Sequence, residues 1–244
     1  MITLSYTRFE LLRTFRNRRF FILSVAFPLG IFLLTAVPNR GVTNLAGTGI
    51  SAPLYFMVGL VAFGTMAAML SSGTRIAAER VSGWTRQLRL TPLPAGAYMQ
   101  TKIATGYLTA MLTMALLFIA GIALGIDLPL VAWLQMTGLV LVGLVPFAAL
   151  GIWLGHVLTA DAVAPAVGAV TAALSFVSGA WYPLGHGTLE DIARHLPSYW
   201  LVQASRVGLS GDAWPAQGWF VVIAWSIGLS LVAARAYRRD TQRA

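Results

Sequence analysis

Long apolar runs separated by short polar segments dominate the pattern of this chain. The apolar runs cover about residues 20–37, 52–73, 103–124, 130–154, 162–181 and 219–234. A helix needs about 20 predominantly apolar residues to cross the hydrocarbon core of a bilayer. The pattern therefore predicts an all-α integral membrane protein with six transmembrane helices, forming a single transmembrane domain over residues 1–244.

The composition favours the same class. The chain is 57% hydrophobic and 10% charged, whereas a soluble domain is about 45–50% apolar and about 25% charged. A soluble protein of 244 residues cannot bury so much apolar surface, and six spans with their loops leave no room for a soluble domain. The chain has no cysteine, which excludes disulfide bonds and thiolate metal sites.

Positive charge sets the predicted orientation. Basic residues gather before the first run, between the second and third runs, and after the last run: Arg8, Arg13, Arg16, Arg18, Arg19, Arg75, Arg80, Arg86, Arg89, Lys102, Arg235, Arg238, Arg239 and Arg243. The opposite side holds only Arg40, Arg194 and Arg206. The positive-inside rule therefore places both termini in the cytoplasm of a multi-pass plasma-membrane protein. Charge clustered beside apolar runs is typical of membrane topology, so the net charge of +9 predicts a bilayer and no nucleic acid as partner.

The segment before the first run, about residues 4–17, has helical periodicity. Leu4, Leu11 and Phe15 fall near one face, and most of the charged residues fall elsewhere. We expect an amphipathic elbow helix that lies on the inner leaflet and leads into the first span. The alternative is a positively charged flank that only fixes the topology.

The loop after the second run predicts a short, separate helix. Gly83 can break the helix that leaves the membrane, and Pro92 and the next proline disfavour helix near residue 91. Between these breaks, Trp84 and Leu88 lie one helical turn apart and could present an apolar face to a partner protein. Flanking positive charge would come from Arg86 and Arg89. The alternative is a solvated loop whose charge serves topology alone.

The segment after the fifth run predicts two short helices at the outer surface. Thr188 is a plausible N-cap for the first of them, Pro197 ends it, and residues 199–209 form the second. Aromatic residues typical of an outer interfacial belt surround them: Trp181, Tyr182, Tyr199, Trp200 and Trp214. An ordinary surface hairpin of helices is the alternative.

Missing chemistry narrows the function. No predicted span carries an acidic or basic residue near its middle, which disfavours an ion-coupled carrier. The chain has no G-x-x-x-x-G-K-[ST] motif and therefore no ATP site of that kind. A membrane-embedded protease would need a nucleophile and base at one depth, but Ser178 and His156 fall at opposite faces. The chain is therefore expected not to be an enzyme by itself, and its three histidines lack metal-ligand spacing.

Polar and aromatic residues within the spans suggest a substrate path. Thr171, Ser175, Ser178 and Tyr182 form a stripe on the fifth span, although such hydroxyls often bond to their own helix. On the second span, Phe56, Phe63 and Met66, with Met57, would suit a hydrophobic or amphipathic cargo. Packing or lipid contact is the alternative for these residues. Two G-x-x-x-G pairs, Gly121 with Gly125 and Gly151 with Gly155, permit close helix contact.

Two groups of residues resemble the signatures of type-2 ABC exporter permeases. The first is Glu79-Arg80…Gly83…Leu88…Thr91-Pro92-Leu93, with Lys102 opening the next span. The second is Ser178-Gly179…Tyr182-Pro183-Leu184…Leu196-Pro197…Arg206. The resemblance covers the whole chain, although Val81 stands where an acidic residue is common.

The resemblance implies a permease without its own ATPase site. A coupling helix near residues 83–90 would dock onto a separate ABC ATPase subunit, which binds the ATP and Mg, so this chain itself needs no cofactor. The residues implied in coupling are Glu79, Arg80, Gly83, Trp84, Arg86, Leu88 and Pro92. A second permease copy, or a homologous permease, would complete a path for efflux of a drug, antibiotic or lipid-like compound. The alternative function is an ATP-independent channel or scaffold, which has no need for a rigid cytoplasmic helix.

Overall fold

A computed structural model describes residues 6, 8–10, 12–13, 16, 25–91, 94–185, 187–210 and 214–243. Within these residues, all regular secondary structure is helical. The α-helices are α3 (Phe27–Ala36), α4 (Ala52–Leu70), α5 (Ser72–Val81), α6 (Trp84–Arg89), α7 (Ala95–Ala123), α8 (Leu130–Gly143), α9 (Val145–Val157), α10 (Ala160–Val177), α11 (Thr188–Ala193), α12 (Pro197–Ser210) and α13 (Ala216–Arg243). A 3₁₀ turn, η2 (Leu45–Gly47), lies in the loop between α3 and α4.

Five helical stretches are long and apolar enough to cross a membrane: Ala52–Val81, Gly96–Ala123, Leu130–Val157, Ala160–Val177 and Ala216–Asp240. They correspond to the second to sixth predicted runs, and the all-α integral membrane class is confirmed. The first run is helical over Phe27–Ala36, and the part before it, residues 20–24, lies outside the described residues. That the first run also spans the membrane, which would make six spans in all, therefore stays a prediction.

The helices differ in length from the apolar runs that predicted them. The second span continues through α5 to Val81, and the third begins at Ala95 instead of residue 103. Apolar runs end where charged residues begin, but these helices continue because their charged residues are paired inside the protein, as described below. The fourth span is divided at Leu144, where α9 begins with Pro146 in its first turn, because proline favours the first turn of a helix and not its interior.

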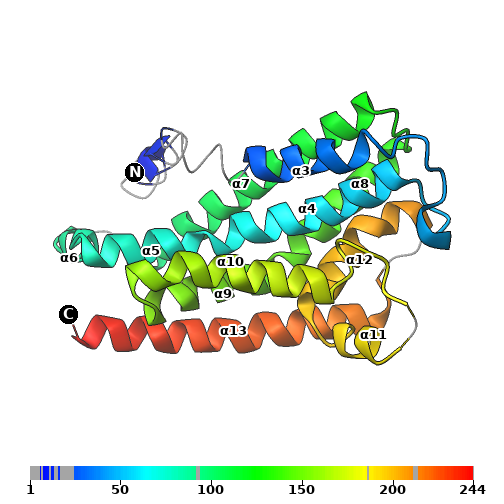
Figure 1. Cartoon of the computed structure of the whole chain (residues 1–244). Coiled ribbons are helices and arrows are strands. Elements are labelled where there is room, and N and C mark those ends of the chain that lie inside the picture. Colours follow the sequence, from blue (N-terminus) through cyan, green and yellow to red (C-terminus); the bar gives the residue numbers. More distant parts are fainter. Residues whose placement is uncertain are drawn as a thin grey trace.

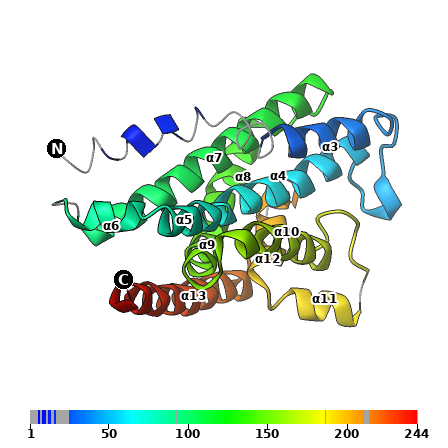
Figure 2. The ribbon, with the colours of Figure 1, turned by 60° about the vertical axis from the view of Figure 1, so that its left-hand side comes forward.

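The helix α4 lies at the centre of an elongated bundle, with α3, α7, α9, α10 and α12 packed around it (Figures 1 and 2). Within its spanning stretch 78% of residues are buried, against 17% for Ala216–Asp240. Side chains of α4 such as Met57, Val61 and Met69 are fully buried and form the middle of the core. The last span instead packs against α9 and leaves most of its surface to lipid.

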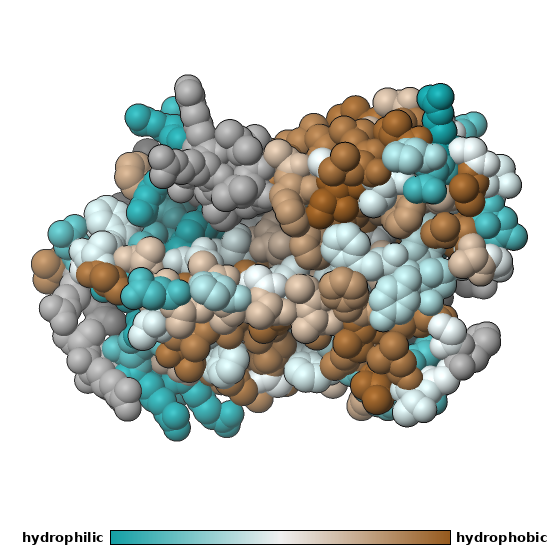
Figure 3. Space-filling view, viewed as in Figure 1, coloured by the Kyte–Doolittle hydropathy of each residue, from teal (hydrophilic) through white to brown (hydrophobic). Residues whose placement is uncertain are grey.

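The two ends of the bundle carry different features. One end holds α6, the end of α13 and the described N-terminal helical turns, and the other holds α11, the loop before α4 and the start of α13 (Figure 1). Figure 3 shows apolar side chains over α13, α10 and α3, and hydrophilic side chains at the ends. The described basic residues that were expected in the cytoplasm, such as Arg13, Arg80 and Arg238, belong to the elements at the first of these ends, which we call the arginine-rich end. The predicted elbow helix rests on Leu4, Leu11 and Phe15, which lie outside the described residues.

At the other end, α11 and α12 are the two short helices expected before the last span. Thr188 was expected to cap α11, but it is the first helical residue, and the N-cap position belongs to Gly187. Pro197 does not end a helix; it begins α12, where its fixed φ angle suits the first turn. The indole of Trp200 donates a hydrogen bond to the Arg194 carbonyl at 2.8 Å, which joins the two helices.

Glycines let α5 and α9 cross in close contact. A Cβ atom on Gly73 would lie 2.3 Å from the Gly151 carbonyl oxygen, and one on Gly155 would lie 2.6 Å from the Gly73 oxygen. The prediction that Gly151 and Gly155 permit close contact is therefore confirmed. The other pair behaves differently, because Gly121 faces the Met57 sulfur, whereas Gly125 has a φ of 87° just after α7 ends.

We expect Gly73→Ala to destabilise the protein by about 1–3 kcal/mol, because the new methyl group would collide with the α9 backbone. Gly168→Ala is the matched control, since that helical glycine of α10 has open space around it and alanine is the better helix former. Thermal unfolding in detergent would show a lower Tm for Gly73→Ala and an equal or higher Tm for Gly168→Ala. Equal Tm values for the two variants would contradict the close crossing.

Candidate functional site

The short helix α6 forms as the sequence predicted. Gly83 adopts a left-handed conformation with φ of 72°, which a residue with a Cβ rarely adopts, and the chain turns there between α5 and α6. Two bonds close the other end: the Leu90 amide donates to the Gln87 carbonyl at 3.1 Å, and the Thr91 hydroxyl donates to the Leu88 carbonyl at 2.6 Å. The helix is thus a defined unit between two breaks.

The side of α6 that the sequence predicted to meet a partner protein contacts other segments of this chain. Leu88 packs against the cluster that contains Tyr6 and Tyr98, and the ring of Trp84 lies 6.5 Å from that of Phe9, between centroids. Both residues are half-buried and contact other segments of the protein, so an outward Trp84–Leu88 face that meets a partner stays a prediction. The side chains of Arg86 and Arg89, and all of Pro92, lie outside the described residues.

Two large apolar side chains near α6 do point outward. Val81, the last residue of α5, is 77% exposed, and Leu90, just after α6, is 89% exposed. Both flank α6, which lies at the same end of the bundle as the end of α13 (Figure 1). An apolar side chain in water carries a free-energy cost that contact with a partner removes.

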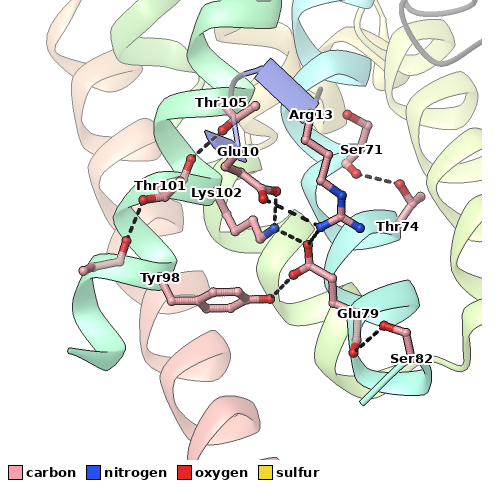
Figure 4. Close-up of polar contacts among 11 residues, drawn as sticks. Glu10, Arg13, Ser71, Thr74, Glu79, Ser82, Tyr98, Thr101, Lys102 and Thr105 are labelled. Carbon is pink, nitrogen blue, oxygen red and sulfur yellow. Dashed lines mark hydrogen bonds and ion pairs between the residues drawn. The ribbon is translucent and has the colours of Figure 1, made fainter. Parts of the chain in front are cut away.

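Between the N-terminal helical residues, α5 and α7 lies a cluster of charged side chains, most of them buried (Figure 4). The Lys102 ammonium donates to Glu79 Oε1 at 2.6 Å and also to Glu10 Oε1. Lys102 is 0% exposed, Glu10 1% and Glu79 2%. The Arg13 guanidinium donates to Glu79 Oε1 at 3.0 Å, and the Tyr98 hydroxyl donates to Glu79 Oε2 at 2.8 Å.

This cluster joins three segments that are distant in sequence. Glu10 and Arg13 belong to the N-terminal helical residues, Glu79 to the last turn of α5, and Lys102 and Tyr98 to the first turns of α7. A buried charge without a partner costs several kcal/mol, so each of these side chains stabilises the position of the others. Burial also raises the pKa of the nearby Tyr6 hydroxyl, and the Glu10 carboxylate raises it further.

Arg80, the next residue along α5, joins a different set of helices. Its guanidinium pairs with Asp240 of α13 at 2.9 Å and donates to the Gly155 and Leu158 carbonyls at 3.0 and 3.3 Å. These carbonyls close α9 and lack partners within the helix. His156 Nδ1 also lies 3.0 Å from the Asp240 carboxylate. Two neighbouring residues of α5 therefore bind different segments: Glu79 binds the N-terminal helical residues and α7, and Arg80 binds α9 and α13.

The proposed path residues divide into a buried hydroxyl group and an aromatic row. Thr171, Ser175 and Ser178 are at most 2% exposed, and each donates to a carbonyl one turn earlier in its own helix. Ser178 also bonds to the Ser198 hydroxyl of α12. Met66 is 2% exposed and belongs to the core.

The aromatic row runs from α3 across α4 to the end of α10. Ring centroids are 6.2 Å apart for Phe27 and Phe63, 5.3 Å for Phe63 and Trp181, and 5.8 Å for Phe176 and Trp181. Tyr182 continues the row at 6.4 Å from Phe176. Phe27 and Phe176 are about half exposed, at 53% and 50%. Phe56 is not part of this row; it packs edge-on against Tyr55 with centroids 6.1 Å apart.

A further contact, not expected from the sequence, fixes the end of α4 near Ala52 against α10 and α12. The Gly179 carbonyl accepts hydrogen bonds from the Tyr55 hydroxyl and the Arg206 guanidinium, each at 2.9 Å. Gly179 has a φ of 71° just after α10 ends, so a glycine suits this position. The Arg206 guanidinium also lies 4.9 Å from the centre of the Tyr55 ring.

Residues 22–235 match the model of a family described as ABC-2 family transporter protein. The chain belongs to the ABC-2 family. It is also similar to the putative transport permease YvfS of Bacillus subtilis (strain 168), with 27% identity over 196 residues that cover 78% of each protein. This ABC-2 protein is accordingly a multi-pass membrane transport subunit of an ABC transporter, a class that works with an ABC ATPase subunit and is found in the bacterial plasma membrane.

Glu79 and Lys102 were expected from the sequence as family-like positions but not as an ion pair. Glu10, Arg13 and Tyr98 were not expected as members of the site. The available signal was opposite charge at the adjoining ends of two consecutive spans, together with an acidic residue in the basic N-terminal segment. Charged residues at membrane depth are rare unless paired.

We expect Lys102→Met to destabilise the protein by about 3–5 kcal/mol, because the change leaves buried carboxylates without their cation. Adding Glu10→Gln should recover part of this loss, since the glutamine removes one of those charges. The free energies of unfolding of both single variants and the double variant in detergent would form the test. Additive destabilisation in the double variant would contradict direct pairing.

Proposed function

We propose that this permease is a six-span subunit of an ATP-driven exporter, with both termini in the cytoplasm and α6 as the helix that docks onto the ATPase. The observation that carries the proposal is the setting of α6. Its inner side packs on the protein through Trp84 and Leu88, it follows the α5 residues that form two ion-paired clusters, and exposed Val81 and Leu90 flank it. Burial of these two side chains against a partner would remove their apolar surface from water.

The same setting suggests how ATPase movement would reach the spans. Binding of ATP and Mg²⁺ to the partner would close the ATPase dimer and displace α6. Because Glu79 is paired with the N-terminal segment and α7, and Arg80 with α9 and α13, α5 cannot move without strain in all of these contacts. Coupling would therefore run through packed elements with two arrangements. Glu79 would act by position, since it is too buried to touch the ATPase itself.

The docking proposal predicts the effect of charge at the outward positions. Val81→Asp and Leu90→Asp should each reduce recovery of the ATPase subunit with the tagged permease from detergent-solubilised native membranes, because a buried aspartate would be unpaired in the interface. Val42→Asp is the matched control, since Val42 is an exposed valine in the loop at the other end. Its ATPase recovery should equal that of the wild type.

Recovery of the permease alone from wild-type membranes, at low and high salt, would contradict the exporter and favour an ATP-independent channel or scaffold. Equal losses in Val42→Asp and Leu90→Asp would contradict the assigned docking surface but not the ATPase partnership. The first outcome therefore tests the proposed function, and the second tests the proposed docking surface.

For the cargo, we propose a hydrophobic or amphipathic compound of the drug, antibiotic or lipid-like kind. Support comes from the half-exposed aromatic row of Phe27, Phe63, Trp181, Phe176 and Tyr182. Stacked and edge-on rings bind apolar and cationic groups well. The row lies on α3, α4 and the end of α10, and only 22% of the spanning stretch of α10 is buried, so a second permease facing this side would enclose a path. Thr171, Ser175 and Ser178 would support that wall from within, and Phe56 and Met66 would shape it.

Phe63→Ala should slow transport of an apolar dye, because Phe63 is the central ring between Phe27 and Trp181. Everted vesicles containing the permease and its ATPase would accumulate Hoechst 33342 when ATP is added. The initial rate should fall by about two- to tenfold in Phe63→Ala, the equivalent of one lost aromatic contact. Phe220→Ala, on the lipid-exposed side of α13, is the control, and an equal loss of rate in both variants would contradict the aromatic path.

A further inference from the structure

A groove of about 500 Å³ lies between α7, α9 and α13. It exists because α13 packs on α9, while α7 packs on α4 and diverges from α13. Small residues widen it: Gly96 on α7, Ala148 and Ala149 on α9, and Ala233 and Ala234 on α13. Gly96 and Ala234 are exposed, so the groove opens to the side of the bundle, where lipid would be.

The groove has the length of one membrane leaflet. Its α7 wall extends from Gly96 to Tyr107, a rise of about 16 Å at 1.5 Å per residue. Half of a hydrocarbon core of about 30 Å is about 15 Å. The lining is apolar along this length, with Met99, Ile103 and Ile152 among the larger residues. A single acyl chain has this shape and chemistry.

Positive charge stands at one end of the groove only. Tyr237 lines the groove in the last part of α13, and Arg235, Arg238 and Arg239 around it are exposed. Arg238 follows Ala234 by one helical turn and so lies nearest the groove face. The neighbouring acid, Asp240, is paired with Arg80 and His156.

We infer that this groove binds one acyl chain of an anionic phospholipid of the inner leaflet, with the phosphate of its headgroup near Arg238. The lipid would fill the gap between α7 and α13 and so join the third and sixth spans. Arginines at the cytoplasmic surface attract anionic lipid by about 1 kcal/mol each. The inference uses the proposed orientation but not export, so a failed transport experiment would leave it standing.

A photoactivatable phosphatidylglycerol, with the reactive group on an acyl chain, tests the inference on the full-length permease reconstituted in vesicles. The same reagent built on phosphatidylcholine gives the comparison. We expect phosphatidylglycerol to label the segments 96–107 and 230–237, and phosphatidylcholine to label them less. Equal labelling by the two lipids, or labelling spread evenly over all lipid-facing helices, would overturn the inference.

Matched variants separate the groove from the general lipid surface. Ala234→Phe should fill the groove and abolish the preferential labelling, whereas Ala224→Phe, at an exposed alanine of the same helix, should not. Arg238→Gln should weaken the apparent affinity for phosphatidylglycerol by roughly fivefold and leave phosphatidylcholine unchanged, and Arg40→Gln at the other end should change neither. Should Ala234→Phe fail to fold, the wild-type and Arg238→Gln results decide alone.

Two results would assign the groove to another occupant and overturn the lipid. If Hoechst 33342 competes with the label and Ala234→Phe stops dye transport while lipid labelling persists, the groove is an entrance for cargo. If Ala234→Phe converts a permease dimer to a monomer without changing the labelling, the groove is an interface between two copies of this chain.

Discussion

The burial of Glu10, Glu79 and Lys102 is the constraint on which the arginine-rich end of the molecule depends. Three charged side chains that are at most 2% exposed must satisfy one another, because the idealised cost of moving such an ion into a low-dielectric interior is of the order of 20 kcal/mol. Their pairing fixes the N-terminal helical residues against α5 and α7. Hydrophobic side chains could hold these segments together equally well. With charged side chains, however, the loss of any one partner leaves another buried charge unpaired.

The position of the cluster relates it to α6, the proposed coupling helix. The α5 residues Glu79 and Arg80 face different neighbours, and together they bind the N-terminal helical residues, α7, α9 and α13. A helix of six residues has little stability by itself, so α6 owes its fixed orientation to these contacts and to Trp84 and Leu88. A force on α6 would therefore be felt by four spans at once. This is the property that a coupling element requires, and it follows from packing and not from the length of the helix.

Periodicity and apolar length were sufficient to predict the class, five of the spanning helices, the α6 break at Gly83 and the two outer helices. They could not predict where charged residues continue a helix, because a run of apolar residues stops at Arg75 or Lys102 whether or not the charge finds a partner. The direction of Trp84 and Leu88 was also beyond reach, since a one-turn spacing states that two residues share a face but not what that face meets. The expected N-cap Thr188 shows a smaller error of prediction, because the observed helix boundary is displaced by one residue.

The pairing of Glu79, Lys102 and Glu10 could have been suspected from sign alone, but its geometry depends on contacts between residues up to 92 positions apart. The aromatic row and the lateral groove are likewise products of tertiary packing. They lie on different sides of the bundle, one formed by α3, α4 and α10 and the other by α7, α9 and α13. We therefore assign cargo to the first and membrane lipid to the second.

The central claim is that α6 meets the ATPase with its outer side while its inner side is held by the permease. Site-specific photo-crosslinking in native membranes tests it directly, with the photoreactive residue placed once at position 90 and once at position 84. We predict that position 90 crosslinks to the ATPase subunit and that position 84 crosslinks within the permease, to the segment containing Phe9. Crosslinking of position 84 to the ATPase, with none from position 90, would contradict the account.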